Sequence, residues 1–162
     1  MLRVEVNYSP RLTRAEQTLL ALPNRLRNLR PLMINVIAPE ANRMLLRYWN
    51  SKGAAYGRVW APWSDSTRAA RIRKGNADKG LLRDTDHLFK AIFRERSTDD
   101  RLRTIEGGLR LQLNTRIPYA IFHQEGTINM PMRQVIPDPL PPSFIRTIRP
   151  LIRQFILSGK VR

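Results

Sequence analysis

Prolines constrain this chain more than any other residue type, because they recur within segments whose apolar spacing is helical. The sequence contains 12 prolines. A first helix is predicted over 10–22, where Pro23 ends it. A second helical stretch is predicted over 24–51, and we expect a break near Pro31 and a kink near Pro39. The N-terminal third of the chain should therefore be long, interrupted helix.

The prolines are densest near the C-terminal end. The stretch 127–142 is predicted to be an extended Pro-rich arm or edge strand rather than core, since proline removes a backbone donor and restricts the chain. An amphipathic C-terminal helix is predicted over 143–157, where apolar residues recur at helical spacing and Pro150 introduces strain.

Alternating apolar and polar residues predict short strands. The alternation is clearest over 109–114, and weaker patterns occur over 1–8, 94–98 and 101–106. The fold class expected is therefore α+β, in which a long N-terminal helix and shorter helices pack on a small antiparallel sheet. A chain of 162 residues fits one domain, here 1–162.

The charge of the chain is strongly positive. Lys and Arg together number 29 against 13 acidic residues, for a net charge of +16. A surface of this kind suits lasting polar interfaces or a nucleic-acid backbone, and composition does not choose between them. There is no cysteine, which excludes disulfides and thiolate metal sites, and we expect no membrane span.

The residues that usually carry catalysis are sparse. His87 and His123 are the two histidines, and neither has further ligands at metal-binding spacing. Asp84 and Asp86 are better explained as charges that cap a short helix. We therefore predict no enzymatic activity, no metal site and no cofactor.

A basic segment, 68–74, follows an aromatic loop that contains Tyr56, Trp60 and Trp63. Basic residues beside aromatic ones could bind a nucleic-acid backbone and stack on bases. The alternative is a solvated helix face next to aromatic anchors that hold the loop to the body of the protein. We favour the second interpretation.

Four short segments share an order and spacing that point to one protein family. They are Gly57-x-x-Trp60-x-Pro62-x-Ser64-x-x-Thr67, Leu82-x-x-Thr85-x-x-Leu88, Tyr119-Ala120-x-x-His123-Gln124-x-Gly126 and Met130-Pro131-x-Arg133. Together they resemble the phage virion morphogenesis family, which comprises tail-completion or head–tail joining proteins of tailed bacteriophages. The sequence departs from the family pattern at Asp86, Glu125 and Gln134, where the family usually has glycine, an aromatic residue and proline.

The resemblance implies a non-enzymatic structural protein of the virion, made in the host bacterial cytoplasm. Such a protein forms a ring at the head–tail interface and is needed for joining tails to heads. The implied partners are further copies of the chain in a cyclic homo-oligomer, expected to be a hexamer, and the adjacent neck or head-completion and tail-tube or tail-terminator proteins. Genome DNA would pass through the ring lumen.

Two sets of residues are assigned to this role. Expected structural anchors are Trp60, Pro62, Trp63, Leu82, Tyr119 and His123. Expected interface residues are Arg103, Arg110, Met130, Pro131 and Arg133. Two alternatives stay open: a tail terminator or other minor tail subunit, and an Arg-rich nucleic-acid-binding protein.

Overall fold

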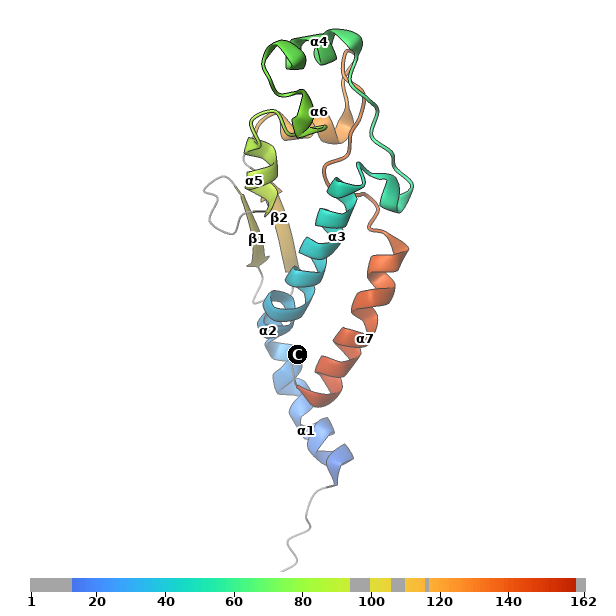
Figure 1. Ribbon diagram of the computed structural model, residues 1–162. Coiled ribbons are helices and arrows are strands. Elements are labelled where there is room, and N and C mark those ends of the chain that lie inside the picture. Colours follow the sequence, from blue (N-terminus) through green and yellow to red (C-terminus); the bar gives the residue numbers. More distant parts are fainter. Residues whose placement is uncertain (1–12, 94–99, 106–109, 116, 160–162) are drawn as a thin grey trace, which may run out of the picture.

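The computed structural model describes residues 13–93, 100–105, 110–115 and 117–159. The molecule is elongated: a long helical run lies beside α7 (Pro142–Ser158), and a group of short helices and loops covers one end (Figure 1). The long run consists, in order, of α1 (Arg14–Arg27), α2 (Arg30–Leu32), the π-helix η1 (Met33–Ile37) and α3 (Ala38–Asn50). We call these elements together with α7 the helical rod.

The first helix begins and ends later than its sequence pattern predicts. Thr13 is the N-cap, and its hydroxyl and the Glu16 carboxylate form a capping box with each other's backbone N–H groups. Pro23 lies inside α1 instead of ending it, and the helix ends at Asn28. The expected break near Pro31 occurs at Asn28 and Leu29, which leaves Pro31 in the first turn of α2, where a missing N–H costs nothing.

The helix changes its hydrogen-bonding pattern just before Pro39. Residues Met33–Ile37 form a π-helix, in which the Ala38 N–H donates to the carbonyl of Met33. In a regular α-helix the Pro39 ring would clash with the carbonyl four residues earlier. The wider π turn relieves this clash, so the kink expected at Pro39 takes the form of a local change in helix type.

One face of the long run carries most of the core. Apolar residues of α2, η1 and α3 pack along α7, first around Phe155 and then around Phe144. At the far end of α3 the same face continues into an aromatic cluster that includes Tyr48 and Trp49. The helices of the rod are therefore stabilised by a continuous apolar stripe at helical spacing.

The predicted α+β class is wrong. The described residues are predominantly helical, and their ladder pairing is limited to one antiparallel pair, β1 (Asp100–Ile105) and β2 (Arg110–Thr115). This pair contacts α5 (His87–Phe93) at the side of the rod, so no sheet layer underlies the helices (Figure 1). The apolar faces of α2, η1 and α3 are buried against α7, so these helices need no sheet to cover them. The strands predicted over 1–8 and 94–98 lie outside the described residues.

The remaining short elements form the end group beyond α3. They are η2 (Ala54–Tyr56), α4 (Asp65–Arg73), η3 (Ala77–Lys79), α5 and α6 (Ala120–Glu125). The stretch 127–142, expected to be an arm rather than core, crosses this group and is partly buried within it. Val135 is buried, and its carbonyl accepts a hydrogen bond of 3.0 Å from the Trp49 indole. We call residues 133–136 the strap.

Candidate functional site

Trp60 anchors the aromatic loop to the helical rod. Its side chain is 4% exposed and packs edge-on against Tyr48 and Trp49, with ring centroids 5.7 and 5.3 Å apart. Gly53, at φ +83°, allows the chain to reverse so that the Trp60 N–H donates to the carbonyl of Lys52. A Cβ at position 53 would lie 1.7 Å from the Arg58 carbonyl oxygen, so the turn requires glycine. Trp60 thus packs between the loop and α3.

The strap is held from both sides by side chains that bond its backbone. On one side the Trp60 indole donates to the Gln134 carbonyl at 2.9 Å. On the other side, the Gln124 side-chain oxygen accepts from the N–H groups of Val135 and Ile136, and its amide donates to the Ile136 carbonyl at 2.8 Å. Gln124 therefore replaces the missing neighbour strand for this segment.

Arg133 joins the strap to the loop that carries Trp60. Its guanidinium donates from Nε to the Ala61 carbonyl and from Nη2 to the Pro62 carbonyl, both at 2.7 Å. Its backbone N–H donates to the His123 carbonyl. The residue is 7% exposed, and burial lowers the pKa of its guanidinium. Arg133 was predicted to lie at an interface; within the subunit its guanidinium is buried and bonds backbone carbonyls of its own chain.

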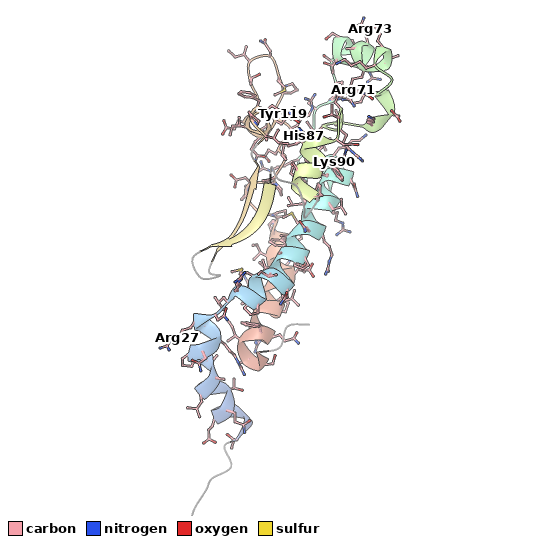
Figure 2. The ribbon with its side chains drawn as sticks, turned by 90° about the vertical axis from the view of Figure 1, so that its left-hand side faces the viewer. Arg27, Arg71, Arg73, His87, Lys90 and Tyr119 are labelled. Atoms are coloured by element: carbon pink, nitrogen blue, oxygen red, sulfur yellow. The ribbon has the colours of Figure 1, made fainter. Side chains whose placement is uncertain are left out.

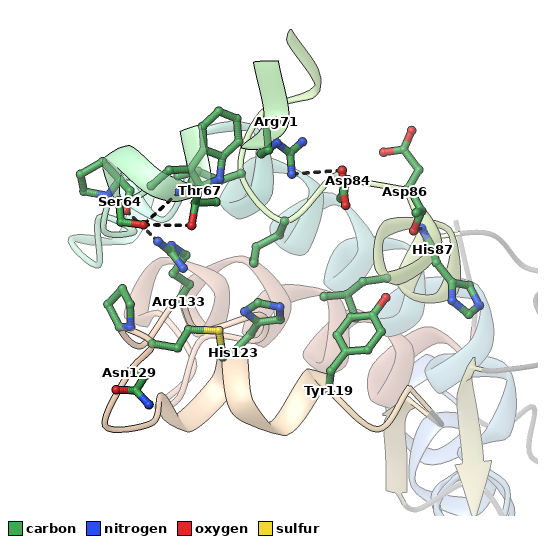
Figure 3. Close-up of a pocket in the computed structure, with 18 residues that line it drawn as sticks. Ser64, Thr67, Arg71, Asp84, Asp86, His87, Tyr119, His123, Asn129 and Arg133 are labelled. Atoms are coloured by element: carbon green, nitrogen blue, oxygen red, sulfur yellow. Dashed lines mark hydrogen bonds and ion pairs between the residues drawn. The ribbon is translucent and has the colours of Figure 1, made fainter. Parts of the chain in front are cut away.

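A cavity of about 800 Å³ lies beside these contacts, between α4, the loop before α5, α6 and the turn after α6 (Figure 3). Eight of the predicted residues line it: Pro62, Trp63, Leu82, Tyr119, His123, Met130, Pro131 and Arg133. Leu82 packs against the core, whereas Pro62 and Pro131 are exposed. Among the described residues no cluster of three or more His, Cys, Asp or Glu side chains could hold a metal ion.

Arg71 forms one wall of the cavity and covers Trp63. Its guanidinium carbon lies 4.4 Å from the centre of the Trp63 ring. The same guanidinium donates to the Asn76 carbonyl and lies 3.6 Å from the Asp84 carboxylate. Trp63 thus contacts the guanidinium of Arg71, and it is not part of the core cluster around Tyr48.

Asp84 and Asp86 both bond side chains outside α5, and the carbonyl of Asp86 accepts from the Lys90 N–H at the start of that helix. The helix they precede begins at His87, and Asp84 accepts from the Asn76 side-chain amide at 3.0 Å. Asp86 has φ +59°, a left-handed conformation that glycine adopts without strain and aspartate tolerates. Its carboxylate accepts from Arg83 Nε at 2.7 Å, and this bond is the main cause of its lowered pKa. The backbone at position 86 thus explains why glycine is suited to this site.

His123 is half-buried on the floor of the cavity, and its ring meets Tyr119 edge-on at 6.0 Å (Figure 3). Its Nδ1 atom is buried and has no hydrogen-bond partner among the described residues. Burial, and secondarily the positive charge of Arg133, lower the pKa of the imidazole. Burial raises the pKa of Tyr119. The lowered pKa favours the neutral form of the imidazole in this half-buried position.

The other expected interface residues lie elsewhere. Arg103 and Arg110 are on β1 and β2, where Arg103 is paired with Gln112 and Arg110 with Ile105, and their side chains are outside the described set. Sequence reasoning missed the roles of Arg71 and Gln124. Gln124 is part of a quoted motif, but its partners are backbone groups 11 and 12 positions away, which the motif does not reveal.

No helix of the described residues is long and apolar enough to cross a membrane. Comparison with known proteins adds no relative: no family model, no curated protein and no solved structure matches the chain.

Proposed function

We propose that this protein is a non-enzymatic structural subunit of a ring at the head–tail junction of a tailed bacteriophage, where it is needed for joining tails to heads. In this proposal the chain associates with further copies of itself in a cyclic oligomer, expected to be a hexamer. The ring contacts adjacent neck and tail proteins and is located in the virion.

One observation carries the proposal: the four segments that resemble the virion morphogenesis family form one packed unit, although they are spread over positions 57 to 133. The first segment contributes Trp60 and the Pro62 carbonyl, which bond the strap and Arg133. The second contributes Leu82 and Leu88 to the core around Trp60. The third contributes Gln124, which holds the strap. Segments whose Trp60, Leu88 and Gln124 hold the subunit together support a structural role rather than catalysis.

A surface suitable for contact with a neighbouring subunit lies on α6 and the turn that follows it. Four large apolar side chains between positions 121 and 132 are about half exposed or more, and one of them, Ile128, is fully exposed. We call this set the α6 turn face; it consists of Ile121, Phe122, Ile128 and Met132. Exposed apolar residues gathered on one segment favour a protein contact.

The α6 turn is built to present these residues in one conformation. Thr127 and Met130 form a β-bridge across the turn, with backbone bonds of 2.8 and 3.2 Å. Gly126 has φ +79°, and a Cβ there would lie 2.9 Å from the Met132 nitrogen, so the chain returns closely over it. Because the turn is ordered before any partner binds, little conformational entropy is lost in binding.

The nucleic-acid alternative required aromatic rings of the loop on which bases could stack, and the two tryptophans of the loop are largely covered. Trp60 is buried in the core, and the Arg71 guanidinium covers one face of Trp63. The aromatic loop therefore offers little free ring surface on which bases could stack. The tail-terminator alternative differs only in the position of the ring, and locating the chain in a density map of the purified virion would distinguish the two.

The proposal is tested by complementing a phage that lacks this gene with the double variant Phe122→Asp/Ile128→Asp. Both side chains are exposed, so the subunit should fold, as measured by circular dichroism and its thermal midpoint. We expect free heads and free tails in electron micrographs in place of joined particles. The matched control is Ile72→Asp, which changes an exposed aliphatic side chain on α4. Normal numbers of joined particles from a folded double variant would overturn the assignment of this face.

A further inference from the structure

Three arginines lie on the outer face of α7. Arg146, Arg149 and Arg153 are exposed, and α7 has no acidic residue between Pro142 and Ser158. At about 100° per residue, these three side chains lie within about 40° of the direction opposite Phe144, which is buried against α3. They form one row about 10 Å long, at a rise of 1.5 Å per residue. We call it the α7 arginine row.

The carboxylates of the rod are already engaged. Glu16 bonds the Thr13 cap, and Glu40 pairs with Arg43 at 2.7 Å. These are the two acidic residues of 14–50. Within the described part of the chain, no ion-pair partner lies within 4.0 Å of any member of the α7 arginine row. Among the described residues, the guanidinium groups of the row therefore have no ion-pair partner.

Other arginines of the protein donate hydrogen bonds to backbone carbonyls of the same subunit. The α7 arginine row contrasts with these. Arg25 donates from Nη1 to the carbonyls of Ile156 and Leu157, at 2.8 Å each, where it neutralises the C-terminal end of α7. Arg71 and Arg133 likewise bond backbone carbonyls. Figure 2 shows how far the cationic side chains extend, with Arg27 near the α1 end and Arg73 at the opposite end.

We propose that the α7 arginine row binds the phosphate backbone of duplex DNA without regard to sequence. Guanidinium groups bind phosphate through two parallel hydrogen bonds, and a row of three can contact successive phosphates. Between Arg146 and Arg153 the outward face adds only Pro150, and the exposed Leu157 follows one turn later. A protein interface usually has an aromatic or aliphatic anchor at its centre, whereas a phosphate-backbone contact needs none.

This binding goes beyond the ring function, because a subunit can join particles without touching DNA. The two can therefore fail separately. The purified protein is titrated into a short fluorescent duplex, and anisotropy gives the affinity between about 50 and 200 mM salt. We expect the logarithm of the affinity to fall linearly with the logarithm of the salt concentration, and scrambled duplexes to bind equally well.

The decisive variant is Arg146→Gln/Arg149→Gln/Arg153→Gln. It should weaken binding and make the salt slope shallower by about 3, close to one unit for each lost phosphate contact. The control, Arg68→Gln/Arg73→Gln/Lys74→Gln, removes the same charge from exposed positions on and next to α4 and should keep the slope. If the α7 triple variant unfolds, Arg149→Gln alone should reduce the slope by about 1.

If the α4 control variant reduces the salt slope as much as the α7 triple variant does, the protein attracts DNA only through its net charge, and the proposal is wrong. An unchanged slope in a folded α7 triple variant would also overturn the proposal. If that variant binds DNA normally but leaves heads and tails unjoined, the row contacts an acidic protein surface, and the DNA proposal is wrong.

Discussion

The guanidinium of Arg133 donates a 2.7 Å hydrogen bond to the carbonyl oxygen of Pro62, a residue 71 positions earlier in the chain. A second bond of the same length reaches the Ala61 carbonyl. The charge that sequence reasoning assigned to a subunit contact thus holds together two segments of one subunit. Because both acceptors are backbone groups, a substitution at position 133 removes the donor from each of them.

Arg133→Met should lower the free energy of unfolding by about 2–4 kcal/mol, since two part-buried, charge-assisted hydrogen bonds are lost. Urea denaturation followed by circular dichroism measures the change. Arg146→Met, at an exposed position, serves as the control and should stay within about 0.5 kcal/mol of the wild type. A loss below about 1 kcal/mol at position 133 would contradict the internal role described for this arginine.

Trp60→Ala should destabilise the protein by about 3–5 kcal/mol, because it empties the centre of the aromatic cluster. Trp60→Phe keeps a ring but loses the hydrogen bond to the Gln134 carbonyl. Loss of this bond should lower the free energy of unfolding by about 1–2 kcal/mol, in addition to a small effect of altered packing. Both are read from chemical denaturation midpoints. Trp63→Ala, outside this cluster, should be milder than Trp60→Ala. The reverse order would mean that the two tryptophans have been assigned the wrong roles.

Substitutions at position 86 separate the need for a positive φ from the hydrogen bond between Asp86 and Arg83. Asp86→Gly removes the bond to Arg83 but suits φ +59°, so its thermal midpoint should stay close to that of the wild type. Asp86→Val should lower the midpoint clearly, because β-branched residues are strained at positive φ. Asp86→Asn is the reference for loss of charge alone. Equal midpoints for the glycine and valine variants would show that the left-handed conformation is not maintained in solution.

Stability should depend on pH through His123. Its pKa is lowered in the folded protein by burial and by Arg133, so the unfolded chain binds the proton more tightly. The stabilisation is fully present above the unfolded pKa of about 6.5, and it is lost as the pH falls through that value towards the folded pKa.

The free energy of unfolding, measured in urea at a series of pH values from about 8 down to 5.5, should therefore decrease more steeply in the wild type than in His123→Gln. His87→Gln changes the other histidine, which is exposed, and should keep the steeper dependence. If both variants follow the wild-type curve, His123 does not titrate differently on folding.

Local patterns in the sequence were sufficient to place several elements. The alternation around Leu111 predicted a strand over 109–114, and β2 spans Arg110–Thr115. The apolar spacing after position 143 predicted the helix observed as α7. Such elements are readable because their periodicity reports which face is buried, whatever covers it. Pro23 was misread for the same reason: the packing of α1 along α7 maintains a helix that local propensity alone would end.

The sequence by itself therefore determined the helical stripe of the rod, the turn glycines and the positive charge. Only the tertiary structure decided that the helices pack on each other rather than on a sheet. It also decided that 133–136 is a buried strap, and that Arg133 serves the interior whereas the α7 arginine row faces outward. The physical reason is that Trp60, Gln124 and Arg133 bond backbone groups of distant segments. Almost every residue has a backbone N–H and a carbonyl group. The sequence therefore does not show which backbone groups these three side chains bond.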